Sequence, residues 1–105
     1  MIQIVFYVPE SHLEPVKQAM FDVGAGRVGD YEHCAWQTAG EGQFRPTEGA
    51  APYLGSIGEV ERVAEFKVEM VCEAQVLRRV IEALRSAHPY EEPAFSYWEI
   101  NRLDL

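Results

Sequence analysis

Two amphipathic helical patterns, each lying between strand-like segments, most strongly limit what this chain can fold into. The first carries Leu13, Val16, Met20 and Val23, and the second carries Val76, Leu77, Val80, Ile81 and Leu84. A spacing of three or four residues places each set on one face of a helix, over residues 11–23 and 74–87. Because each helix has an apolar face to bury, we expect both to pack on a shared sheet.

Four segments around these helices have strand character: residues 2–8, 31–38, 63–72 and 94–100. Segment 63–72 alternates apolar with charged residues, which indicates a half-buried strand. Segment 2–8 is apolar on both sides, which is typical of a strand covered on both faces. The order β-α-β-β-α-β is that of the split βαβ arrangement, so we predict an α+β fold of the ferredoxin-like class.

Glycine and proline predict the long connection between the second and third strands. Residues 40–42 (Gly-Glu-Gly) suggest a turn that returns the chain through residues 43–45 as an extra hairpin, which Pro46 ends. Residues 47–58 contain four glycines or prolines and predict a loop without regular structure. Loops of about this length in compact domains are usually functional or mobile.

Residues 24–29 (Gly-Ala-Gly-Arg-Val-Gly) match the G-x-G-x-x-G pattern of dinucleotide-binding proteins, but in the wrong context. That motif follows a strand and opens a helix, whose first amides bind the pyrophosphate. Here it follows the first helix, whose start is predicted by a capping box of Ser11 and Glu14. We therefore interpret Gly24 as a left-handed helix cap and the run as a turn.

Composition narrows the class of protein. A chain of 105 residues with 48% hydrophobic content is expected to form one domain over residues 1–105 without metal or disulfide staples. A net charge of −8 disfavours nucleic acid as a partner. The sequence shows neither a leader pattern nor an apolar run of about 18 residues, so we expect a soluble protein without a membrane partner. Cys34 and Cys72 form no Cys-x-x-Cys pair, which fits two buried thiols in a reducing cytoplasm.

Two helices cover only one face of a four-stranded sheet. The other face would expose Val5, Tyr7, Val63 and Val71, or their neighbours. Because exposed apolar patches of this kind usually mark association, we expect a homo-oligomer that buries this face. A monomer with a half-solvated sheet is the alternative.

Four stretches of the sequence, residues 24–31, 40–46, 48–50 and above all 88–94 (His-Pro-Tyr-Glu-Glu-Pro-Ala), resemble the YqfO domain of the Nif-three-like family. The resemblance implies a fold similar to the CutA and PII trimers, in which ferredoxin-like subunits pack their sheets around a three-fold axis. In the larger relatives, flanking domains build a two-metal site from segments that have no counterpart here. The resemblance therefore assigns none of those ligands to this chain and implies architecture more than function.

The densest group of polar side chains follows the second helix, between two prolines that fix its path. The candidate ligand-binding residues are His88, Tyr90, Glu91, Glu92, Phe44 and Arg45. Imidazole and carboxylates suit a divalent cation or a small polar ligand, and Phe44 with Arg45 would line a cleft between subunits. The alternative is structural: His88 bonds the last helix carbonyls, and the carboxylates bond backbone amides or Arg45.

The candidate metal ligands are His88, Glu92 and His33. His33 and Cys34 are neighbours on the predicted strand, so their side chains leave on opposite faces and cannot chelate one ion together. A metal at His33 would therefore need a ligand from elsewhere, such as His88. Otherwise His33 is a packed or solvent-facing histidine.

These observations favour a non-enzymatic, trimer-forming module that senses a small ligand or supports assembly. No activated nucleophile accompanies the histidine and carboxylates, so the sequence predicts no catalytic residue. The first alternative is a metal-binding protein of the CutA type, with a divalent metal ion as its cofactor. The second is a protein related to metal-dependent hydrolases, by analogy with the larger relatives.

Overall fold

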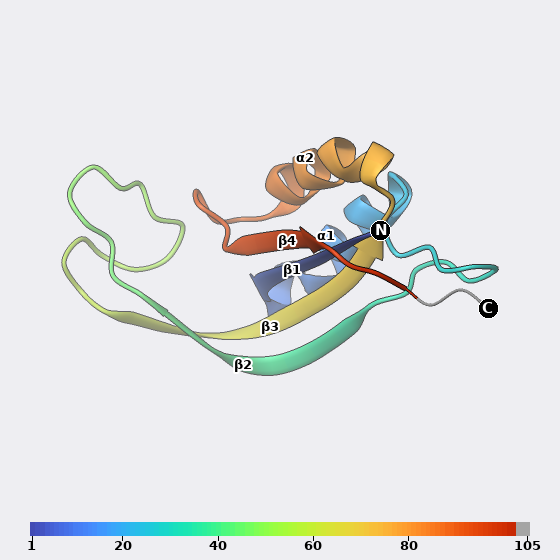
Figure 1. The fold of residues 1–105 in the computed structure, drawn as a ribbon. Helices are drawn as coiled ribbons and strands as arrows, with labels where there is room; N and C mark the ends of the chain where they lie inside the picture. The colour runs from blue at the N-terminus through green and yellow to red at the C-terminus, as the bar shows by residue number, and fades with distance from the viewer. Residues whose placement is uncertain (103–105) are drawn as a thin grey trace.

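The computed structural model describes residues 1–102 and forms a four-stranded antiparallel sheet with two helices on one side (Figure 1). The strands are β1 (Ile2–Pro9), β2 (Trp36–Phe44), β3 (Glu61–Cys72) and β4 (Phe95–Glu99); the helices are α1 (Glu10–Asp22) and α2 (Leu77–Ala87), the latter preceded by the 3-10 turn η1 (Ala74–Val76). The strand order β2-β3-β1-β4 confirms the predicted ferredoxin-like α+β fold. Neither helix is long and apolar enough to cross a membrane.

The core lies between the helices and one face of the sheet. Its members come from β1 (Ile2, Ile4, Phe6, Val8), β3 (Val68, Met70, Cys72), α1 (Leu13, Val16, Met20, Phe21) and α2 (Val80, Leu84). The alternation predicted for residues 63–72 is confirmed at the buried positions of β3. β1 is the central strand, because it pairs with β3 on one side and β4 on the other.

The glycine-rich run at residues 24–29 ends a helix, as interpreted from its order in the sequence. Gly24 has φ 110° and donates its N–H to the Phe21 carbonyl at 3.0 Å, which is half of a Schellman cap. Gly26 has φ 75° and donates its N–H to the carbonyl of Val71 in β3 at 2.8 Å. A Cβ on Gly26 would lie 2.7 Å from the Phe21 ring and 2.9 Å from the Cys34 carbonyl. This segment therefore packs against its neighbours too closely for a side chain.

Gly26→Ala is expected to lower the free energy of unfolding by about 2–4 kcal/mol, since it adds left-handed backbone strain and a clash. Gly29→Ala is the matched control. Gly29 also has a positive φ, of 57°, but an added Cβ meets nothing within 4 Å. Its expected cost is the backbone strain alone, about 1–2 kcal/mol. Denaturant unfolding of both variants measures the difference, and equal losses would show that the close packing at Gly26 does not matter.

The turn predicted at residues 40–42 is wrong, because these residues lie inside β2. β2 pairs with β3 as far as Phe44, whereas β1 ends at Pro9, opposite Glu65. β2 and β3 therefore extend past the rest of the sheet as a long hairpin (Figure 1), and the loop 45–60 closes it. This loop has no regular structure, as predicted for residues 47–58. The Gly-Glu-Gly run does not turn because all three residues pair with β3, opposite residues 63–65.

The starts of two elements also differ from the prediction. β2 begins at Trp36 rather than at Tyr31, because His33 has φ 57° and turns the chain before the strand. α1 begins at Glu10 with Pro9 at its cap, so the predicted capping box is wrong. The Ser11 hydroxyl is hydrogen bonded to the imidazole of its neighbour, His12, at 2.8 Å instead. Proline already has the extended backbone that a helix cap needs.

The face of the sheet opposite the helices, the open face, carries three large exposed side chains. Tyr7, Trp36 and Trp98 are 39%, 69% and 48% exposed. The strand register places all three on this face, since Trp36 and Val5 both lie opposite Glu69. The expectation of exposed apolar residues on this face is confirmed for Tyr7. It is wrong for Val5, which is buried because β3 and β4 flank it, and Val63 and Val71 are only partly exposed.

Candidate functional site

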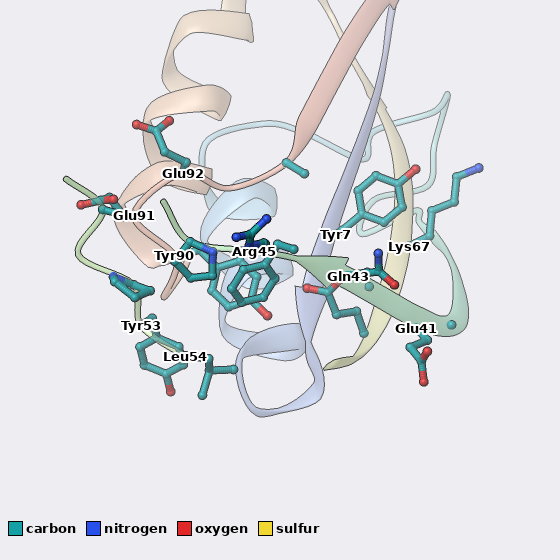
Figure 2. A pocket seen from close by; sticks show the side chains of 18 of the residues that line it. Tyr7, Glu41, Gln43, Arg45, Tyr53, Leu54, Lys67, Tyr90, Glu91 and Glu92 are labelled. Carbon is teal, nitrogen blue, oxygen red and sulfur yellow. The ribbon is translucent and has the colours of Figure 1, made fainter. Parts of the chain in front are cut away.

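A cavity of about 750 Å³, the end cavity, lies where β2 and β3 extend past β1. Tyr7, Phe44, Glu65 and Lys67 line it from the open face of the sheet. Side chains of the loop 45–60 and of the connection 88–94 enclose it, as Figure 2 shows for Tyr53, Leu54, Tyr90, Glu91 and Glu92. Its volume is within the range of small-molecule binding sites.

Tyr90 is the centre of an aromatic cluster that joins four separate segments of the chain. Its ring centroid lies 4.9 Å from that of His88, 6.0 Å from that of Phe44 and 6.1 Å from that of Tyr53. Tyr53 in turn lies 6.0 Å from His12 in α1. These separations are typical of packed aromatic pairs. The structure thus brings together the predicted residues His88, Tyr90 and Phe44, and adds Tyr53, which the sequence did not single out.

His88 is buried and uses both ring nitrogens within the fold. Nε2 lies 2.7 Å from the carbonyl oxygen of Tyr7, and the backbone N–H of Tyr90 donates to Nδ1 at 3.1 Å. A carbonyl can only accept, so Nε2 carries the proton and the imidazole is neutral. The N–H of Tyr7 donates to the carbonyl of Ala94 at 3.2 Å. The backbone of Tyr7 therefore holds both ends of the connection 88–94.

Arg45 and Glu91 both line the cavity and tie the loop 45–60 in place. The Arg45 Nε donates to the carbonyl of Gly58 at 3.0 Å, and the N–H of Gly58 donates to the carbonyl of Pro46 at 2.7 Å. The carboxylate of Glu91 accepts from the N–H of Ala51 at 3.3 Å. These bonds match the structural alternative considered for Glu91, although its partner is a backbone amide of the loop.

The three candidate metal ligands are not brought together. The ring of His33 stacks on that of Phe21, at the end of α1, with centroids 4.8 Å apart. His88 is bonded to Tyr7 near the other end of β1, where Glu92 also lines the cavity. Within residues 1–102, no group of three or more His, Cys, Asp or Glu side chains is arranged to hold a metal ion.

Glu65 and Tyr90 form a polar pair that the sequence did not predict. The Tyr90 hydroxyl is buried and lies against the carboxylate of Glu65, and within residues 1–102 it bonds no other group. Burial raises the pKa of Tyr90, and the carboxylate of Glu65 adds to this effect. That carboxylate lies over Gly42 in β2, where a Cβ would overlap its Oε1. A glycine in a strand often marks such a close approach, which is the signal that could have identified this site.

Protonation of His88 is expected to destabilise the fold at mildly acidic pH. Burial is the main cause that lowers the pKa of His88 from its ordinary 6.5. Below pH 6.5 the unfolded chain therefore binds a proton that the folded chain does not, so stability is complete above 6.5 and falls as the pH decreases. Urea unfolding between pH 7.5 and 5.5 should show this decline in the wild type and a smaller one in His88→Gln.

His12→Gln is the control for this pH dependence, because His12 is only partly buried and bonds its exposed neighbour, Ser11. Its decline with pH should stay close to that of the wild type, since His12 is only the last of the causes that act on the pKa of His88. A separate NMR titration of the His88 ring protons should give a pKa below the ordinary 6.5. An equal decline in all three proteins would contradict the role of His88.

Comparison with known proteins identifies relatives of this chain. No family model matches it. The "GTP cyclohydrolase 1 type 2 homolog" of Mycobacterium tuberculosis is 52% identical over 96 residues, which cover 91% of this chain and 25% of that protein. The chain thus spans about a quarter of the length of the curated relatives it matches.

Solved structures agree on the fold. The Bacillus cereus protein related to NIF3 has a TM-score of 0.83 and 39% identity, covering 96% of this chain and 26% of that one. The PII-like protein CutA from Nostoc sp. PCC 7120 has a TM-score of 0.68 and 20% identity, covering 96% of this chain and 82% of that one. The likeness to CutA, at 20% identity, shows the fold alone. The mycobacterial and Bacillus cereus relatives are also similar in sequence, at 52% and 39% identity over more than 90% of this chain. The predicted resemblance to the YqfO domain of the Nif-three-like family is therefore confirmed, over about a quarter of the length of these relatives.

Proposed function

We propose that this chain is a non-enzymatic module that assembles into a trimer through its open face and holds a small ligand in the end cavity. The observation that carries the assembly is the exposure of Tyr7, Trp36 and Trp98 on one side of one sheet. Burial of apolar surface contributes roughly 25 cal/mol per Å². Copies of the same chain are the occupant that the CutA-like fold supports, since trimers of that kind pack their sheets together.

The chemistry of the end cavity supports binding rather than catalysis. His88 is committed to two structural hydrogen bonds, so its imidazole is not available as a general base. The cavity is lined by aromatic and carboxylate side chains, and no serine or cysteine of residues 1–102 lines it. The chain spans about a quarter of the length of its relatives. We therefore assign a sensing or assembly role to this domain and propose that any hydrolase activity belongs to the larger proteins. We further propose that residues 1–105 fold as one domain in the cytoplasm.

Sedimentation velocity of the purified chain tests the proposal. At micromolar concentration we expect a species of three times the 11.9 kDa chain mass. Sedimentation equilibrium over a tenfold dilution then gives the association constant. A monomer throughout this range would refute the assembly.

A further inference from the structure

We infer that the end cavity takes an organic cation with a flat apolar body, bound by the carboxylate of Glu65 and packed against the rings of Tyr90, Phe44 and Tyr53. This inference rests on the proposed ligand-holding function and names the class of ligand. It is carried by the charge balance of the cavity, by the placement of Glu65 and by the buried hydroxyl of Tyr90 beside that carboxylate.

The charged side chains of the cavity are two more acidic than basic. They are Glu41, Glu65, Glu91, Glu92, Arg45 and Lys67. Glu41 lies 3.7 Å from Arg62, and both Glu91 and Arg45 are hydrogen bonded to the backbone of the loop 45–60. Glu65 forms no ion pair within residues 1–102. Glu92 also forms no ion pair there, but it is exposed, whereas Glu65 is partly buried on the sheet. Glu65 is therefore the carboxylate better placed to take a cation.

The position of Glu65 is fixed by the strand beside it. Glu65 lies opposite Gly40 in the sheet register, and its carboxylate occupies the space that a side chain at Gly42 would fill. Glu65 is only partly exposed, and the sheet covers one side of its carboxylate. A carboxylate that has lost part of its water and has no ion partner gains more from a bound cation than an exposed one does.

The aromatic cluster supplies the second part of the site. Aromatic faces attract cations, and this attraction strengthens when water is displaced. The buried hydroxyl of Tyr90 lies against the carboxylate of Glu65 and bonds no other group within residues 1–102. A planar cation with two N–H donors can bond the carboxylate with one and the hydroxyl with the other. An amidinium on an aromatic ring has this shape and charge.

Isothermal titration calorimetry with benzamidine tests the inference on the full chain. Benzamide, its neutral isostere, and benzoate, its anionic counterpart, are the comparison ligands. We expect benzamidine to bind at least about 10-fold more tightly than either. Glu65→Gln should remove this preference. Glu69→Gln removes the same charge from the same face of β3 without touching the cavity, and should change the affinity less than about twofold.

A second pair of variants tests the geometry without changing any charge. Gly42→Ala displaces the Glu65 carboxylate and should weaken benzamidine binding about as much as Glu65→Gln. Gly29→Ala also adds a methyl group to a glycine, but at a position outside the cavity where nothing lies within 4 Å, and should leave binding intact. Circular dichroism confirms that each variant is folded.

The outcomes separate this inference from the proposed function. Benzamide or benzoate binding as tightly as benzamidine would overturn the cation preference but leave a ligand cavity in place. If benzamidine, benzamide and benzoate all failed to bind, the inference would also be overturned. The trimer is judged independently by sedimentation, whose result does not depend on these ligands.

Discussion

Phe6→Ala is expected to lower the free energy of unfolding by about 3–5 kcal/mol, because it removes a large side chain from the middle of the core. Phe6 is fully buried on the central strand β1, beneath the helices. β1 is paired on both sides, so the backbone cannot readily collapse into the space that the ring leaves. Urea unfolding at one fixed protein concentration measures the loss, since assembly makes stability concentration-dependent.

Tyr31→Ala is the control for this core substitution. Tyr31 is also aromatic, but it is 76% exposed and lies outside the four strands. Its removal should cost less than about 1 kcal/mol. If Phe6→Ala cost no more than Tyr31→Ala, the core described between the sheet and the helices would be incorrect.

Trp36→Arg is expected to weaken the proposed trimer by at least about 100-fold. Tryptophans at the centre of an interface typically contribute about 2–4 kcal/mol, and a buried arginine without a partner adds a desolvation cost. The isolated subunit should tolerate the change, because position 36 lies opposite Glu69, with which an arginine can pair across the strands. Sedimentation equilibrium of the variant and the wild type measures the effect.

Tyr31→Arg introduces the same charge at an exposed aromatic residue that lies outside the four strands. It should leave the association constant within about threefold of the wild type. If both arginine variants remained trimers, the open face would not be the surface that the subunits share.

The order of the elements was predictable because its signals are local. The alternation in residues 63–72 and the helical spacing in residues 74–87 each depend on neighbours within a few positions. The same holds for the glycine run at residues 24–29, whose place after a helix excluded a dinucleotide site. Errors arose where pairing decides the structure: the Gly-Glu-Gly run at residues 40–42 is typical of a turn until β3 is placed beside it.

The candidate site was found only in part, for a similar reason. His88 and Tyr90 stand out because they belong to one dense motif, and the structure shows their rings in contact. Glu65 has the pattern of an ordinary outward-facing charge on a half-buried strand, and Tyr53 lies in an irregular loop. Only the register of β2 on β3 and the path of the loop bring these two residues to the motif.

The double attachment of the connection 88–94 to Tyr7 limits how this part of the molecule can deform. The carbonyl of Tyr7 holds the His88 end of the segment, and the N–H of Tyr7 holds the Ala94 end. The central strand β1, and not the segment itself, therefore sets the distance between these two ends. Releasing either end would leave a polar backbone group without its bond, at a cost of about 1–3 kcal/mol. Thermal motion of the connection 88–94 is thereby restricted to the residues between its two attachment points. A ligand in the end cavity would meet a segment whose ends stay a fixed distance apart.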